Sequence, residues 1–126
     1  MIKTRKLAPN QISSFQNICS NLASCATLPM PGIYPQELKD CGINERGTLR
    51  NVLLGYVATQ PSGSQLAIET VFYDKKDGND DGDLHIVNFQ DETITSYYRG
   101  WGTWEQYYGN QHHAYKDYLR VGTNNQ

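Results

Sequence analysis

The stretch "QLAIETVFYDKKDGNDDGDLHIVNFQDETITSYY", residues 65–98, decides the fold of this chain. It contains three runs rich in β-branched and aromatic residues, which predict strands at 65–74, 84–90 and 92–98. A further run of this kind precedes them at 48–60, and the "PSGS" that follows it has the composition of a turn. Four successive strands with short connections predict an antiparallel meander.

Helical patterns flank these strands in the sequence. Pro9 suits the first position of a helix, and apolar residues then recur at intervals of three and four, which predicts a helix over 9–25. A capping-box pattern at 103–106 predicts a C-terminal helix over 104–120. We therefore expect an α+β fold in which a four-stranded antiparallel meander packs against N-terminal and C-terminal helices.

The stretch between the first helix and the strands is rich in proline. Residues 27–35, "TLPMPGIYP", hold three prolines, which neither a helix nor a central strand tolerates, and this composition predicts a connecting loop. Pro35 can open a short second helix, which Gly42 would close. In the strand at 65–74 apolar residues alternate onto both faces, so each face of the sheet needs partial cover.

Length and composition predict a single domain spanning 1–126. The net charge is −2, and no block of like charge indicates a nucleic-acid or membrane partner. No run approaches the roughly 20 apolar residues of a membrane span, and the N-terminus lacks the apolar run of a signal peptide, so we expect a cytoplasmic protein. The three cysteines match neither a zinc site nor a disulfide framework, which favours reduced thiols: Cys19, Cys25 and Cys41.

The connection between the strands at 65–74 and 84–90 is strongly acidic. It carries five Asp within the ten positions 74–83, and from Asp77 onward it follows the D-x-N-x-D-G start of a calcium-binding EF-hand loop. The twelfth position holds Asn88 in place of the bidentate Glu, and strand-like flanks replace the helices, so an EF-hand is excluded. A hairpin-tip Ca²⁺ site remains, with these ligands: Asp77, Asn79, Asp81 and Asp83.

A second interpretation of this loop, which we favour, needs no metal. The Asp-Gly pairs at 77–78 and 81–82 suit turns that require a positive φ, so the acidic segment can serve as a polar hairpin tip. Lys75 and Lys76 offset part of the negative charge, which weakens the calcium interpretation. We therefore expect no obligatory cofactor, with Ca²⁺ as the candidate ion.

The segment 96–118 is unusually aromatic. It holds eight of the fourteen aromatic residues of the protein, interleaved with Arg99 and Lys116. A core stripe of the C-terminal helix explains three of them: Trp104, Tyr108 and Tyr115. The remainder resemble the Tyr-rich and Trp-rich centre of a protein interface. The predicted partner-binding residues are Tyr97, Tyr98, Arg99, Trp101, Tyr107 and Tyr118.

No catalytic motif occurs in the sequence. His112 and His113 are adjacent and cannot easily ligate one ion from a helix, while His85 is expected to be a semi-buried, hydrogen-bonded strand residue. The sequence favours a small non-enzymatic binding or regulatory protein that engages a macromolecule through residues 97–118. The favoured partner is another protein. A calcium-responsive module and a single-stranded nucleic-acid binder stay open, although the net charge does not favour nucleic acid. A metal-dependent hydrolase is the least favoured alternative.

Overall fold

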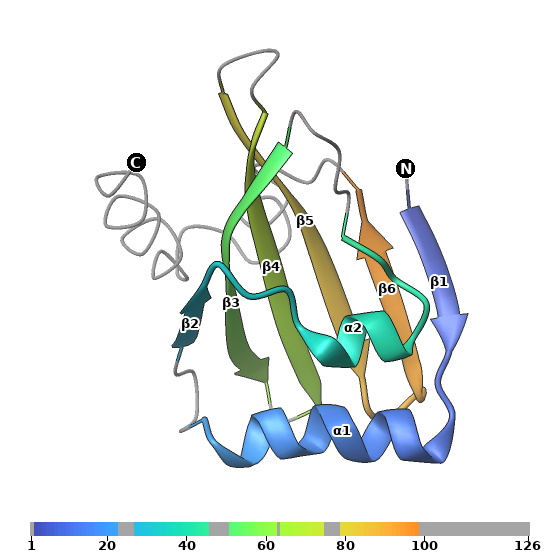
Figure 1. Cartoon of the computed structure of the whole chain (residues 1–126). Helices are drawn as coiled ribbons and strands as arrows, with labels where there is room; N and C mark the ends of the chain where they lie inside the picture. Colours follow the sequence, from blue (N-terminus) through green and yellow to red (C-terminus); the bar gives the residue numbers. More distant parts are fainter. Residues whose placement is uncertain (1, 23–26, 46–50, 63, 75–78, 99–126) are drawn as a thin grey trace.

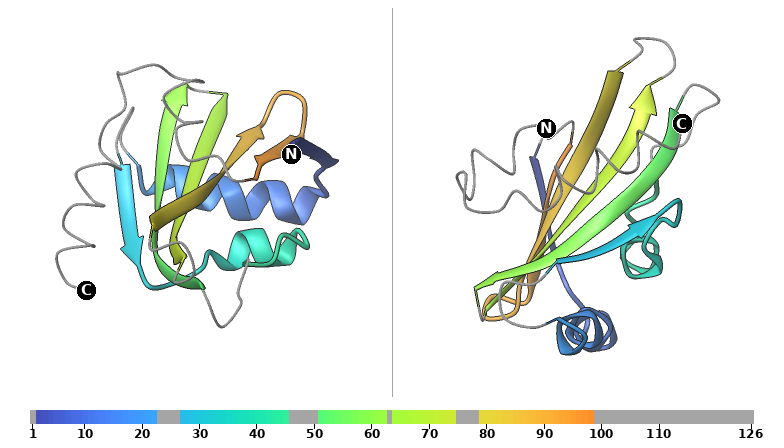
Figure 2. Two further views of the ribbon diagram at one scale, coloured as in Figure 1. Left: turned by 90° about the horizontal axis from the view of Figure 1, so that it is seen from above. Right: turned by 90° about the vertical axis from the view of Figure 1, so that its left-hand side faces the viewer.

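The computed structural model describes residues 2–22, 27–45, 51–62, 64–74 and 79–98. The strands of this part are β1 (Ile2–Lys6), β2 (Thr27–Pro31), β3 (Asn51–Ser62), β4 (Gln65–Asp74), β5 (Asn79–Asn88) and β6 (Thr93–Tyr97). The helices are α1 (Pro9–Ser20) and α2 (Gln36–Asp40). The strands form one antiparallel sheet in the order β1-β6-β5-β4-β3-β2, and both helices lie on one face of it (Figures 1 and 2).

The α+β class is confirmed, but the predicted four-stranded meander is incomplete. β3, β4, β5 and β6 pair consecutively, as the sequence predicts. β1 extends this meander beyond β6, and β2 extends it beyond β3. The prediction of a loop over 27–35 is wrong for β2, because an edge strand pairs on one side only and so tolerates prolines. The predicted C-terminal helix over 104–120 lies outside the described residues.

Helix α1 begins at Pro9, as predicted, and its first turn is closed by Gln11, whose side-chain oxygen accepts the Ala8 N–H at 2.8 Å. It ends at Ser20, earlier than predicted. The reason is local. The Ser20 hydroxyl and the side-chain amide of Asn21 both donate to the Asn17 carbonyl oxygen, and these bonds compete with continuation of the helix. Neither α1 nor α2 is long and apolar enough to cross a bilayer.

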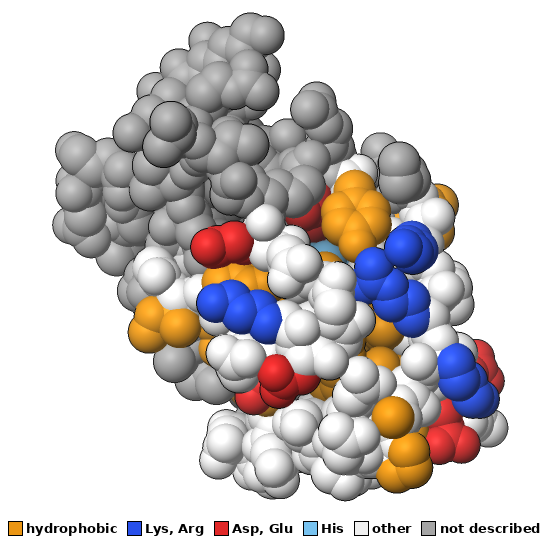
Figure 3. Space-filling view, turned by 45° about the vertical axis from the view of Figure 1, so that its right-hand side comes forward, with side chains coloured by type: hydrophobic (Ala, Val, Ile, Leu, Met, Phe, Trp, Pro, Cys, Tyr) orange, Lys and Arg blue, Asp and Glu red, His pale blue; other side chains and the backbone are white. Residues whose placement is uncertain are grey.

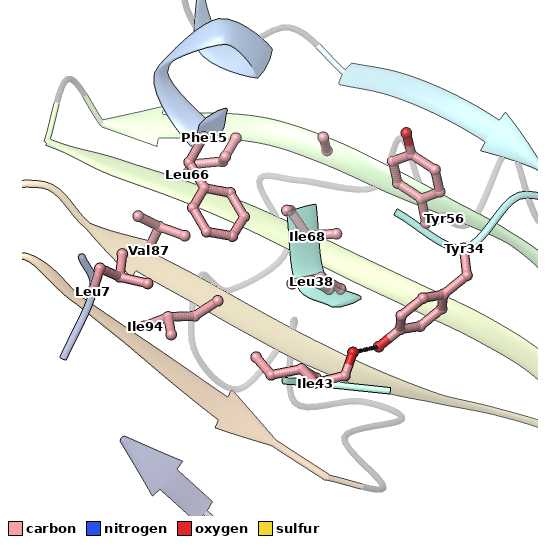
Figure 4. Packing of buried hydrophobic residues seen from close by; sticks show 11 residues of the cluster. Leu7, Phe15, Tyr34, Leu38, Ile43, Tyr56, Leu66, Ile68, Val87 and Ile94 are labelled. Carbon is pink, nitrogen blue, oxygen red and sulfur yellow. Dashed lines mark hydrogen bonds between the residues drawn. The ribbon is translucent and has the colours of Figure 1, made fainter. Parts of the chain in front are cut away.

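Helix α2 ends as the sequence predicts. Gly42 has φ +77°, and its N–H donates to the Lys39 carbonyl oxygen at 2.9 Å. The Ile43 N–H donates to the Leu38 carbonyl oxygen at 2.9 Å, so the two bonds complete a Schellman motif. This turn directs Ile43 back into the core beside Leu38 (Figure 4).

The main core lies between the sheet and the two helices, on what we call the helix face of the sheet. Phe15 of α1 and Leu38 of α2 are fully buried there, against Leu66, Ile68 and Val87 of the sheet (Figure 4). Cys19 and Cys41 are free thiols that pack at the margin of this core, and burial raises the pKa of both. Their apolar surroundings support the packing role predicted for Cys19.

The opposite face of the sheet, which we call the far face, is also buried in its centre. Its buried apolar residues are Val57, Ala67, Leu84 and Ile86. Glu69 lies among them, directly opposite Val57 on one side and Leu84 on the other. Neither of the described helices lies on this face (Figure 2). Both faces of the sheet therefore carry apolar residues, as the alternation in β4 predicts.

The hairpin of β4 and β5 is longer than predicted. β5 begins at Asn79, so only positions 75–78 separate it from β4, and these lie outside the described residues. The Asp-Gly pair at 81–82 was predicted as a turn and instead belongs to β5. A Cβ at Gly82 would lie 2.5 Å from the carbonyl oxygen of Thr70, so the glycine permits a close approach of two strands.

Candidate functional site

Strand β1 is an open edge of the sheet within the described part of the chain. One position beyond its last pair with β6, the Leu7 N–H donates to the Glu92 carbonyl oxygen at 2.8 Å. Hydrogen-bonded pairs alternate along an antiparallel ladder, so residues 5 and 3 form the next such pairs with β6. Three residues of β1 therefore direct their backbone N–H and C=O groups away from β6: Ile2, Thr4 and Lys6.

The contact between Thr4 and Thr95 agrees with this assignment. Their Oγ1 atoms lie 3.1 Å apart and share a hydrogen bond across the two strands. Side chains approach most closely in pairs that exchange no backbone hydrogen bonds. Thr4 is thus a residue whose backbone donor and acceptor face outward from the sheet edge.

The corner between β1 and β6 exposes apolar surface. Ile2 is 65% exposed and Ile33 is 57% exposed, and they are the exposed large hydrophobic residues of the described chain. Ile2 stands directly opposite Tyr97, the last residue of β6, which is half-buried. Ile33 lies apart from this pair, between β2 and α2. Tyr97, the first aromatic residue of the predicted segment, therefore lies opposite an exposed aliphatic side chain.

Positive charge is concentrated on the same edge. β1 carries Lys3, Arg5 and Lys6 and no acidic residue. Lys6 donates from Nζ to the Asp91 carbonyl oxygen at 2.9 Å, which fixes its side chain near the turn before β6. Figure 3, in which the side of β1 comes forward, shows Lys and Arg side chains with hydrophobic side chains between them.

The other edge of the sheet differs in its backbone chemistry. β2 contains Pro29 and Pro31, which have no N–H to donate. Each proline of β2 faces a residue of β3 in the antiparallel ladder. β1, in contrast, contains no proline. Of the two edges, β1 is the one at which every outward-facing residue keeps its donor.

A buried polar cluster lies on the helix face behind β1. The ring Nδ1 of His85 is 2.8 Å from Ser96 Oγ, and both residues are buried. The ring of Tyr98 meets the His85 ring edge-on, at 6.1 Å between centroids and an interplanar angle of 81°. His85 Nε2 has no hydrogen-bond partner among the described residues. His85 is thus more deeply buried than predicted, and only one of its ring nitrogens is bonded there.

This cluster strongly disfavours additional charge. The pKa of His85 is lowered to about 3, mainly by burial and in second place by the positive charge of the neighbouring Arg5. Burial is also the main cause that raises the pKa of Tyr34, and the negative charge of Asp83 contributes to the same increase. The Tyr34 hydroxyl donates to the Ile43 carbonyl oxygen at 3.0 Å (Figure 4). At neutral pH the imidazole and the phenol are therefore uncharged.

The structure describes two of the six residues predicted to bind a partner. Tyr97 ends β6, and Tyr98 follows it on the helix face beside His85; both are half-buried. The other four lie outside the described residues: Arg99, Trp101, Tyr107 and Tyr118. The partner-binding assignment of all six stays a prediction.

The candidate calcium ligands are distributed differently from a loop site. Asp77 lies outside the described residues, while Asn79 and Asp81 belong to β5. Asp83 is also in β5 and is buried, and its carbonyl oxygen accepts a hydrogen bond from Thr70 Oγ1 at 3.3 Å. Within the described residues, no group of three or more His, Cys, Asp or Glu is arranged to hold a metal ion. The calcium interpretation stays a prediction.

Sequence reasoning missed β1 and the residues that it brings together. Its only local signal is the alternation of Ile2 and Thr4 with Lys3 and Arg5. An alternation over five residues is too short to distinguish a strand from a loop. Comparisons with protein-family models, with curated proteins and with solved structures found no match for the chain.

Proposed function

We propose that this chain is a small non-enzymatic binding protein that engages another protein at the corner of β1 and β6. The observation that carries the proposal is the pairing of Ile2 with Tyr97. Ile2 is 65% exposed and lies directly beside the start of the aromatic segment. An exposed aliphatic residue next to an aromatic one is suited to become the apolar centre of an interface once a partner covers it.

Burial supports a binding role over a catalytic one. The pair His85 and Ser96 is a histidine within hydrogen-bonding distance of a hydroxyl, as nucleophilic catalysis requires. Both side chains are buried, however, so a substrate could not reach them without a rearrangement of the surrounding residues. Their contact is better explained as satisfaction of two buried polar groups.

The chemistry of the corner supports a protein partner over a nucleic acid. The cations of β1 are few, and the chain as a whole carries a net charge of −2. Non-specific nucleic-acid binding depends on the neutralisation of several phosphates by a broad basic surface. The apolar pair of Ile2 and Tyr97 contributes nothing to phosphate binding, whereas it suits a protein surface.

The test is affinity capture from the native host, with one arm treated with nuclease. The chain also offers a matched control, because Ile33 is similarly exposed but lies away from the corner. We expect Ile2→Ser to remove most of the captured protein, Ile33→Ser to leave it, and nuclease to have no effect. Equal capture by both variants would contradict the proposal, and capture lost on nuclease treatment would favour nucleic acid.

A further inference from the structure

We infer that the edge of β1 accepts an extended acidic segment of the partner protein as an added strand. This inference rests on the proposed function and specifies its partner chemistry and its binding mode. An added strand obtains affinity from main-chain hydrogen bonds and specificity from the side chains at alternate positions. The open edge of β1 offers both.

The backbone of β1 is ready for pairing. Ile2, Thr4 and Lys6 direct their N–H and C=O groups away from β6, as the phase set by the Leu7 to Glu92 hydrogen bond requires. No backbone hydrogen bond occupies these groups from another described segment. The prolines of β2 make the opposite edge a poorer acceptor of a strand. The inference therefore concerns β1 alone.

The charges of β1 select the occupant. Lys3, Arg5 and Lys6 would face the side chains of any strand that pairs with β1. A second copy of β1 would place lysine and arginine against lysine and arginine, which is unfavourable. An acidic segment would instead find opposite charges along the edge.

The alternation of side chains defines the pattern of the partner. Lys3 and Arg5 share the helix face, because Arg5 stands opposite the core residue Ile94. Ile2, Thr4 and Lys6 lie on the far face, where the Asp91 carbonyl oxygen already accepts a hydrogen bond from Lys6 Nζ. Lys3 is exposed and offers its ammonium group to a carboxylate on this face, whereas Nη1 of Arg5 is buried and adds positive charge from behind. The fitting partner has acidic residues at every second position and apolar or β-branched residues between them.

The test uses the whole chain and a capped seven-residue peptide that alternates Val and Glu. Binding is measured by fluorescence anisotropy and compared with a peptide that alternates Val and Lys. We expect the acidic peptide to bind and the basic one not to bind.

The contribution of the backbone is tested with two variants of Thr4. Thr4→Pro removes the side-chain hydroxyl and one outward-facing N–H, whereas Thr4→Ala removes the hydroxyl and keeps that N–H. We expect Thr4→Pro to bind the acidic peptide about tenfold more weakly than Thr4→Ala does.

A second measurement leaves the protein unaltered in case Thr4→Pro does not fold. The acidic peptide methylated at every backbone nitrogen keeps its charge and side chains but has no backbone donor, and we expect it not to bind. Equal binding of the methylated peptide, or no binding of the unmodified peptide at millimolar concentration, would overturn the inference. If capture still depends on Ile2 in that case, the proposed function stands and only the added strand is wrong. If capture does not depend on Ile2, the proposed function itself fails.

Discussion

His85 Nδ1 and Ser96 Oγ lie 2.8 Å apart, and they join β5 to β6 through a polar contact in the interior of the protein. The two residues stand directly opposite each other on neighbouring strands, on the face that the helices cover. The contact favours the observed register of β5 and β6, because a shift of β6 by one residue would turn Ser96 to the far face and leave His85 without this partner. Because His85 is buried, we expect the free energy of unfolding to depend on pH.

Acid should destabilise the protein through His85. Its pKa is about 3 in the folded chain, against an ordinary value of 6.5, so the unfolded chain takes up the proton first. The contribution of this group is therefore complete above pH 6.5 and is lost as the pH falls from 6.5 towards 3. We expect a loss of about 2 kcal/mol between pH 7 and pH 5, measured by urea unfolding. In His85→Gln the loss over this interval should be smaller by about that amount, and equal slopes would contradict the assignment.

Removal of the Ser96 hydroxyl should cost more than removal of an exposed one. Ser96→Ala leaves His85 Nδ1 without its partner in the interior, which we expect to cost about 1–3 kcal/mol. Thr95→Ala is the matched control, because half-buried Thr95 also bonds across strands, through an exposed hydrogen bond with Thr4. That variant should lose less than about 1 kcal/mol in the same unfolding experiment. Equal losses would mean that the buried contact contributes no more than the exposed one.

Gly82→Ala should destabilise the chain although Gly82 lies within a strand. The added Cβ would lie 2.5 Å from the Thr70 carbonyl oxygen, so β4 and β5 would have to move apart. We expect a loss of about 1–3 kcal/mol, the usual effect of a group inserted into a packed site. The melting temperature measures it. An unchanged or raised melting temperature would show that the two strands separate easily at this position.

Calcium binding at the acidic hairpin is tested by calorimetric titration with calcium and with magnesium. The candidate site lacks the bidentate Glu of an EF-hand, so we expect any dissociation constant to fall in the roughly 10⁻⁴ to 10⁻³ M range. Binding should disappear when Asp77→Asn is combined with Asp81→Asn. Absence of heat at millimolar calcium would end the calcium interpretation, and heat that persists in the double variant would place the ion elsewhere.

The candidate site could be predicted only in part. The aromatic composition from the end of β6 onward predicts a site that includes Tyr97 and Tyr98, and these two residues lie at one end of the sheet. It could not place Tyr97 beside Ile2, because these residues are far apart in the sequence and meet only through the pairing of β1 with β6. Likewise, the sequence predicts His85 only as a strand residue. Its contact with Ser96 and its proximity to Arg5 depend on the pairing of distant strands.

The sequence by itself determined the features that depend on neighbouring residues. Pro9 begins α1 because its fixed φ suits a first turn, Gly42 ends α2 because it accepts a positive φ, and the composition of 65–74 matches β4. The tertiary structure decided what depends on distant partners. β1 and the proline-containing β2 are strands because β6 and β3 supply their hydrogen bonds, and residues 79–83 extend β5 because β4 pairs with them. A short segment of this kind has too little intrinsic preference for one conformation, so pairing with the neighbouring strand determines it.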